Sequence, residues 1–233
     1  MSRIEQDKGK RGSLKWIQRA VNERWADLDQ PILAKVPRAL SINWSSSLVA
    51  DNYAEYRDAG FLARLELSDM EAELAGFWPA RGPQWDALGR TDAGHVLLVE
   101  AKAHVQELCS SSTAAGPESR GIIEKRLAEV ASRLGARNGH APWADQFYQL
   151  GNRLAHLEFL RQRGVPAYLV LVNFLNDSDM SGPTTIEAWQ AAYDVALHVM
   201  GLGRRHALSA YMVDVYPDVS RYRDGPPPSP EGA

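Results

Sequence analysis

The feature that most constrains the fold is the segment at residues 95–103, which reads His-Val-Leu-Leu-Val-Glu-Ala-Lys-Ala. Its first residues are apolar and β-branched, and such a run predicts a buried strand. Side chains alternate along a strand, so we expect Glu100 and Lys102 to point to one face and Val99 and Ala101 to the other. The sequence therefore predicts a buried strand that ends in an acid and a lysine side by side.

A second acid stands on the preceding apolar segment. Asp86 lies in Trp-Asp-Ala-Leu at residues 85–88, and a turn-rich connection at residues 89–94 separates it from the next strand. A hairpin across that turn would bring Asp86 beside Glu100. Two carboxylates and an ammonium at the end of a buried sheet are costly unless a further charge compensates them, and a divalent cation is the usual compensation.

These residues carry a resemblance to a known family. The pattern Pro83, Asp86, Glu100-Ala101-Lys102 resembles the active-site signature of the PD-(D/E)xK nuclease superfamily, which has the restriction-endonuclease-like fold. The resemblance covers roughly residues 72–220, and Glu100-Ala101-Lys102 is the only acid-x-Lys triplet in the chain. Pro83 precedes Asp86 by three residues here, whereas the family has the two adjacent.

The resemblance implies a metal-dependent enzyme that hydrolyses phosphodiester bonds in nucleic acid, with DNA favoured. It implies that Asp86, Glu100 and the backbone carbonyl of Ala101 hold Mg²⁺ or Mn²⁺, a hard cation that prefers oxygen ligands. Lys102 would orient the attacking water or balance the charge of the phosphate.

One further metal ligand is expected from the first helix of such folds. The apolar residues of segment 46–65 predict a helix, and Glu55 lies in its middle, where that acid would be. The alternative for Glu55 is a solvent-facing glutamate. Residues 73–78 are then predicted to be the first strand.

The predicted helix at residues 142–163 is the second informative element. It is apolar over most of its circumference, which is typical of a buried helix, and its remaining stripe is mostly uncharged. That stripe consists of Asp145, Gln149, Asn152 and His156. We expect Gln149 and Asn152 to point into the active-site cleft, toward a phosphate or a metal-bound water, and Arg153 to hold a phosphate. The alternative is a partly exposed helix edge.

The order of elements predicts an α/β fold with a mixed central sheet flanked by helices, that is, a restriction-endonuclease-like core with an extra N-terminal helix. Further helices are predicted from residue 13, over 118–136 and from Thr184, which would cap its helix; further strands are predicted over 165–176 and 210–216. We divide the chain into an N-terminal tail and helical extension (1–45, with 1–13 disordered), a nuclease-like domain (46–222) and a disordered Pro-rich tail (223–233). The N-terminal helix is expected to pack on the core, with docking in a homodimer as the alternative.

Composition limits the partners. A net charge of −3 argues against a broad electrostatic footprint on nucleic acid, so contacts must come from a local patch or through a metal ion. The single cysteine, Cys109, excludes a disulfide framework and a cysteine-based metal cage, which fits a reducing, cytoplasmic setting. With no apolar run of about 20 residues and no signal-peptide pattern, we expect no membrane partner.

Other catalytic classes lack their motifs. The chain has no Gly-x-Ser-x-Gly elbow, no phosphate-binding Gly-x-x-x-x-Gly-Lys loop, and no paired histidines at metal-ligand spacing. The competing hypothesis is a non-cleaving nucleic-acid-binding or assembly module that retained the fold. The acidic net charge favours it, and the intact set of Asp86, Glu100 and Lys102 argues against it.

Overall fold

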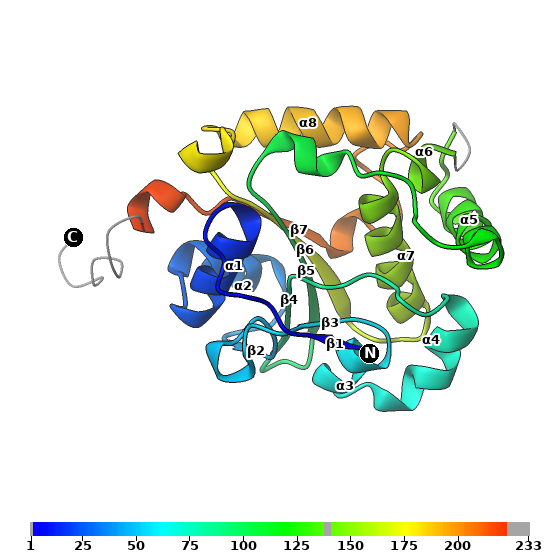
Figure 1. Ribbon diagram of the computed structural model, residues 1–233, viewed down its shortest axis with the longest axis horizontal. Coiled ribbons are helices and arrows are strands. Elements are labelled where there is room, and N and C mark those ends of the chain that lie inside the picture. The colour runs from blue at the N-terminus through cyan, green and yellow to red at the C-terminus, as the bar shows by residue number, and fades with distance from the viewer. Residues whose placement is uncertain (1, 138–140, 223–233) are drawn as a thin grey trace.

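A computed structural model describes residues 2–137 and 141–222. The chain is α/β, with a five-stranded mixed sheet between layers of helices (Figure 1). In spatial order the strands are β2 (Ile42–Trp44), β4 (Ala87–Thr91), β5 (Val96–Lys102), β6 (Ala167–Asn173) and β7 (Met212–Val215). The first two pairings are antiparallel and the last two are parallel. The predicted α/β class and mixed sheet are confirmed.

The β4–β5 hairpin has the register that the sequence predicted. Ala87 lies opposite Val99, and the Asp86 N–H donates to the Val99 carbonyl at 3.2 Å. β4 continues through Thr91, so the turn is shorter than expected. Every residue of β5 is buried, including Glu100 and Lys102. The acid of one strand therefore lies beside the acid of the next.

Two separate cores cover the two faces of the sheet. On one face α1 (Gly12–Asn22) and α2 (Ala26–Lys35) pack against Leu97 and Val99 of β5. On the other face, the helices that follow β5 pack against Leu98. These are α5 (Pro117–Arg133), α6 (Ala141–Ala144), α7 (Tyr148–Gln162) and α8 (Ile186–Val199). Figure 1 shows α1 and α2 on one side of the sheet and α5 to α7 on the other.

The alternation along β5 is confirmed by these two cores. Val99 and Ala101 pack with α1 and α2, while Leu98 faces the opposite helices. Glu100 and Lys102 share the face of Leu98, which is the face that α7 covers. The N-terminal helices therefore form one layer of the fold. Residues 42–44, within the segment assigned to the extension, form the edge strand β2.

Three predictions in the first third of the chain are wrong. Segment 46–65 is a short 3-10 turn (Val49–Asp51), then β3 (Glu55–Tyr56), then α3 (Ala59–Arg64). A continuous helix fails because Asn52, Tyr53 and Asp58 have φ values of 51°, 50° and 50°, which no α-helix contains. Residues 73–77 belong to helix α4 (Glu71–Phe77) rather than to a strand, and Trp78 follows the end of the helix. The predicted disorder of residues 1–13 is also wrong, since β1 (Arg3–Ile4) pairs with β3.

Later elements differ only in detail. The helix predicted over residues 142–163 is interrupted after α6 and resumes as α7. Thr185, not Thr184, caps α8, since its hydroxyl accepts the Ala188 N–H at 3.3 Å. The predicted Pro-rich tail at 223–233 lies outside the described residues. Across the ranges 2–137 and 141–222, no helix combines the length and apolar character needed to cross a membrane.

Candidate active site

A cavity of about 470 Å³ opens at the end of β5, beside the start of α7. Its walls come from segments far apart in the sequence: β3, the loop before β4, the end of β5, the loop after it and the first two turns of α7. All of the residues predicted to be catalytic, metal-binding or substrate-binding line it, namely Glu55, Asp86, Glu100, Ala101, Lys102, Gln149, Asn152 and Arg153. The structure thus brings the whole predicted set together.

The hairpin fixes the two central acids. The Ala101 N–H donates to Asp86 Oδ2 at 2.7 Å, which holds the Asp86 carboxylate against the end of β5. Glu100 and Lys102 project from the same face of β5, and Lys102 Nζ lies 2.9 Å from Glu100 Oε1. Both side chains are almost fully buried. A strand end that carries an acid and a lysine thus becomes a buried ion pair.

Arg153 from α7 completes this arrangement. Its Nε lies 2.5 Å from Glu100 Oε2, and its Nη2 donates to the Gln84 carbonyl at 2.7 Å. The guanidinium also lies 4.7 Å from the centre of the Trp85 ring, in cation–π contact. Both carboxylate oxygens of Glu100 therefore bond to cations. Sequence reasoning assigned Arg153 to a phosphate; in this structure its partner is Glu100.

Glu55 reaches the cavity from β3 and not from a helix. Its side chain is buried, with an exposed fraction of 5%, so the solvent-facing alternative does not hold. Glu55 Oε2 accepts hydrogen bonds from Gln6 Nε2, at 3.0 Å, and from Gln84 Nε2. Neither glutamine was predicted. No local pattern marks them, because one precedes Glu55 by 49 residues and the other follows it by 29.

The remaining residues of the predicted helix stripe separate into three groups. Gln149 Oε1 accepts from Lys102 Nζ at 3.2 Å, and Asn152 Oδ1 accepts from Arg153 Nη1 at 3.0 Å, so both belong to the cavity. Asp145 precedes α7 and pairs with Arg120 outside the cavity. His156 lies under the cavity among aromatic rings, and its Nδ1 bonds to the Asn152 carbonyl. Burial lowers the pKa of His156 to about 3, so this ring is neutral.

Four acids and three cations line the cavity: Glu55, Asp86, Glu100 and Glu107, against Arg81, Lys102 and Arg153. Burial, followed by the charges of Glu100 and Glu55, raises the pKa of Asp86 well above its usual value. Burial also raises the pKa of Glu55, against the hydrogen bonds from its two glutamines. Burial acts in the same direction on Glu100, but Arg153 and Lys102 outweigh it and hold the pKa of Glu100 below its usual value. The formal charge of the lining is one negative charge in excess, and the raised pKa values of Asp86 and Glu55 show that the cavity disfavours this excess in the absence of a further cation.

The oxygen donors of this cavity fit a hard divalent cation. Asp86 and Glu100 present carboxylates at one corner, and their excess negative charge is the kind that Mg²⁺ or Mn²⁺ compensates. In the part of the chain that the structure describes, no three His, Cys, Asp or Glu side chains group closely enough to form a metal centre by themselves. A divalent ion bound by Asp86 and Glu100 would need water for its other ligand positions, as Mg²⁺ usually does.

A hydroxyl-rich loop forms another wall that sequence reasoning treated as an ordinary connection. Residues 110–113 read Ser-Ser-Ser-Thr and line the cavity. Ser110 Oγ accepts the Gln149 N–H at 3.0 Å, and the Ser110 N–H donates to the Gln146 carbonyl at 2.9 Å. These bonds fix the loop to the start of α7, while Ser111 and Ser112 are exposed at the cavity. Neutral hydroxyls there can donate to an oxygen-rich ligand.

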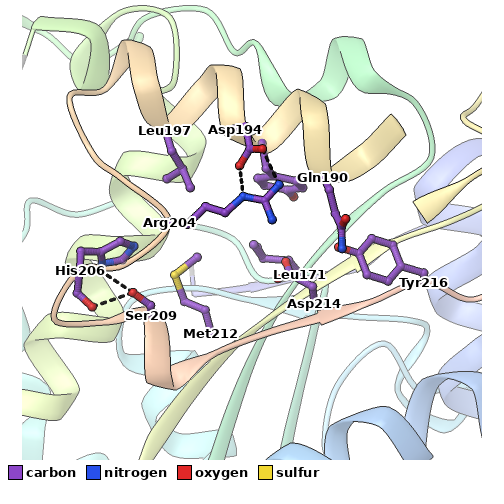
Figure 2. A pocket seen from close by; sticks show the side chains of 11 residues that line it. Leu171, Gln190, Asp194, Leu197, Arg204, His206, Ser209, Met212, Asp214 and Tyr216 are labelled. Carbon is purple, nitrogen blue, oxygen red and sulfur yellow. Dashed lines mark hydrogen bonds and ion pairs between the residues drawn. The ribbon is translucent and has the colours of Figure 1, made fainter. Parts of the chain in front are cut away.

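A second cavity, of about 180 Å³, lies between α8 and β7 (Figure 2). Arg204 bonds through two nitrogens to Asp194 of α8, and Asp214 of β7 lies across from them. The rest of the lining is largely apolar or aromatic, including Leu171 and Met212. No residue predicted from the sequence to be functional lines this cavity.

The chain has no significant match among known proteins. No family model, no curated protein and no solved structure matches it significantly. The assignment of a function therefore rests on the residues of the cavity.

Proposed function

We propose that this protein is a divalent-metal-dependent nuclease that hydrolyses phosphodiester bonds, with DNA as the favoured substrate. The observation that carries the proposal is the meeting of Asp86, Glu100, Lys102 and Gln149 in one cavity, from three elements of the fold. Asp86, Glu100 and Lys102 are the residues of the PD-(D/E)xK resemblance, and Gln149 comes from the uncharged stripe of α7.

Each residue has a role that its contacts support. Asp86 and Glu100 would hold Mg²⁺ or Mn²⁺, and the bound ion would supply Lewis-acid polarisation of the phosphate and a more acidic water. Lys102 has three N–H donors, of which Glu100 and Gln149 accept two, so one is left for a phosphate oxygen or the attacking water. Gln149 fixes the Lys102 ammonium from the side opposite β5. The hydroxyl-rich loop at 110–113 would contact the sugar–phosphate backbone.

One observation favours a second candidate, a nucleic-acid-binding or assembly module that does not cleave. Arg153, the strongest candidate for a phosphate contact, is bound to Glu100, and the chain as a whole carries a net charge of −3. A non-cleaving protein would keep such a buried charge network for its structure alone. The two candidates differ in what loss of Lys102 does.

The deciding experiment is the nicking of supercoiled plasmid in Mg²⁺ and in Mn²⁺, with EDTA as the blank. Asp86→Ala and Lys102→Ala should each lower the rate at least about a hundredfold, because each removes a group that acts on charge developing at the phosphate. Asp194→Ala and Arg204→Ala alter an ion pair of the second cavity and serve as matched controls that should cleave at the wild-type rate. Equal rates from all five proteins, or nicking that persists in EDTA, would reject the proposal.

A further inference from the structure

We propose that Arg153 is a resident counter-cation for Glu100 and competes with the divalent metal ion for this carboxylate. Metal entry would then release the guanidinium from Glu100 and leave it available at the cavity wall. The proposal rests on the function proposed above for the identity of the incoming cation. It concerns a positioning residue, since Arg153 acts through Glu100.

The geometry of Glu100 is the first step of the argument. Its Oε1 faces Lys102 Nζ at 2.9 Å and its Oε2 faces Arg153 Nε at 2.5 Å. Each of these three side chains is buried, with exposed side-chain fractions of 5–6%. A metal ion that binds Glu100 therefore meets an oxygen that already carries a cation, and the two cations repel each other. Lys102 lies on the same strand, two residues from Glu100, whereas Arg153 comes from α7 and has other partners, so the contact with Arg153 is the one that Glu100 gives up.

The second step concerns where Arg153 goes. Its Nη2 already donates to the Gln84 carbonyl at 2.7 Å, its Nη1 donates to Asn152 Oδ1 at 3.0 Å, and its guanidinium contacts the Trp85 ring. These contacts do not involve Glu100 and remain when the carboxylate turns to a metal ion. The guanidinium then keeps its charge at the cavity wall with Nε free to donate to an anion, for which its planar geometry is well suited.

The third step is the charge balance. The cavity is lined by four acids and three cations, which is a formal excess of one negative charge: Glu55, Asp86, Glu100 and Glu107 against Arg81, Lys102 and Arg153. Removing the Arg153 charge raises the excess to two, which a divalent ion neutralises completely. A divalent ion and the single positive charge of Arg153, about 8 Å apart, repel each other by roughly 1 kcal/mol even in water. This repulsion corresponds to about a fivefold difference in metal affinity. Loss of Arg153 should thus tighten metal binding, although most substitutions in a metal site weaken it.

The test is direct measurement of Mn²⁺ binding by the loss of the electron paramagnetic resonance signal of the free ion. Arg153→Gln should bind Mn²⁺ at least about fivefold more tightly than wild type. Arg153→Lys keeps the charge and should stay within about twofold. Arg133→Gln is the matched control, because Arg133 forms the same type of pair with Glu158, at 2.6 Å, away from the cavity. It should leave the affinity unchanged.

A thermal measurement covers the case in which Arg153→Gln is poorly folded without metal. Mn²⁺ should then raise the melting temperature of Arg153→Gln more than that of wild type, since the ion replaces the lost charge. Equal or weaker Mn²⁺ binding by Arg153→Gln, or equal thermal shifts, would overturn the proposal. Plasmid nicking by wild type combined with unchanged affinity in Arg153→Gln would reject this inference alone. Tighter binding in Arg153→Gln without nicking by wild type would reject the nuclease and keep the inference.

Discussion

The cleft at the end of β5 and the cavity between α8 and β7 use similar residues in different ways. Both combine acids with an arginine, and both lie beside a strand and a helix. In the second cavity, Arg204 and Asp194 expose 61% and 43% of their side chains and satisfy each other. In the cleft, Glu100 and Arg153 expose 6% each, and their network joins elements separated by 53 residues.

The difference in burial between these two charge clusters indicates which of them is the better candidate for a function. An exposed, balanced pair costs little and contributes little, so its presence needs no further explanation. A buried network with unequal charges is costly to desolvate, and hydrophobic residues of the same volume often serve stability better. The presence of such a network in the cleft is therefore an argument for a role other than stability. Three predictions test this comparison. Each makes the same type of substitution once in the cleft and once in the second cavity.

The largest difference is expected from removal of one acid. Glu100→Gln leaves Lys102 and Arg153 buried without their carboxylate, and breaking a buried pair in this way costs about 3–5 kcal/mol. Asp194→Asn in the second cavity should leave the midpoint of urea unfolding nearly unchanged, because water solvates Arg204. The measurement is urea denaturation of both variants at pH 7.5 in EDTA. Similar midpoints for the two variants would show that removing an acid from the cleft network destabilises the protein no more than removing one from a surface ion pair.

A smaller difference concerns the two histidines that lie beside the cavities. Burial lowers the pKa of His156 from 6.5 to about 3. Below pH 6.5, His156 is therefore protonated in the unfolded chain but stays neutral in the folded protein. Stability from this group is therefore complete above pH 6.5 and lost as pH falls, by about 2 kcal/mol at pH 5. The measurement is the free energy of unfolding at pH 5 and pH 7.5 for wild type and His156→Phe.

His206 in the second cavity provides the comparison. Burial lowers its pKa as well, but the residue is only half-buried, so His206→Phe should change the pH dependence less. The pH dependence of wild type should exceed that of His156→Phe by the full amount stated above. A larger change in His206→Phe than in His156→Phe would contradict the contrast between the two regions.

The smallest effect is expected from neutralising one carboxyl in each region. Glu100 and Glu55 add to burial in raising the pKa of Asp86, whereas Lys35 and Arg204 oppose burial at Asp214. The folded protein therefore holds a proton on Asp86 at pH values where the unfolded chain has lost it, and stability falls as pH rises above 3.8. Asp86→Asn should raise the melting temperature in EDTA at pH 8 by about 2–4 °C, and by little at pH 4.

Asp214→Asn should give a smaller gain at pH 8 than Asp86→Asn, since its charge has cations nearby. Scanning calorimetry at the two pH values measures both variants. A loss of stability in Asp86→Asn at pH 8 would mean that the charged form of this carboxyl is the favoured one even without metal.

Sequence alone predicted the parts of the fold whose signal is local. The apolar run before Glu100 marked β5, and alternation along it correctly paired Glu100 with Lys102 on one face. The turn after β4 then placed Asp86 beside them. The uncharged stripe on α7 correctly pointed to Gln149 and Asn152, because a buried polar group needs a partner.

Other features depend on contacts that no local pattern encodes. Glu55 was correctly expected in the cavity, but it was assigned to a helix. Residues with positive φ on either side of β3 prevent that helix, and Glu55 lies in a strand. The ion pair of Arg153 with Glu100 and the amides of Gln6 and Gln84 join segments that meet only after folding. Helix α4 was missed although Met70, Leu74 and Phe77 have helical spacing, so there the signal was present and was misread.

The pairing of β1 with β3 has a practical consequence for work on this protein. Gln6 donates a hydrogen bond to Glu55, which lines the cleft, so the Glu55 carboxylate is supported by a segment that lies outside the five-stranded sheet. Limited proteolysis that removes residues 2–6 would take a hydrogen bond from Glu55 while leaving the five-stranded sheet untouched.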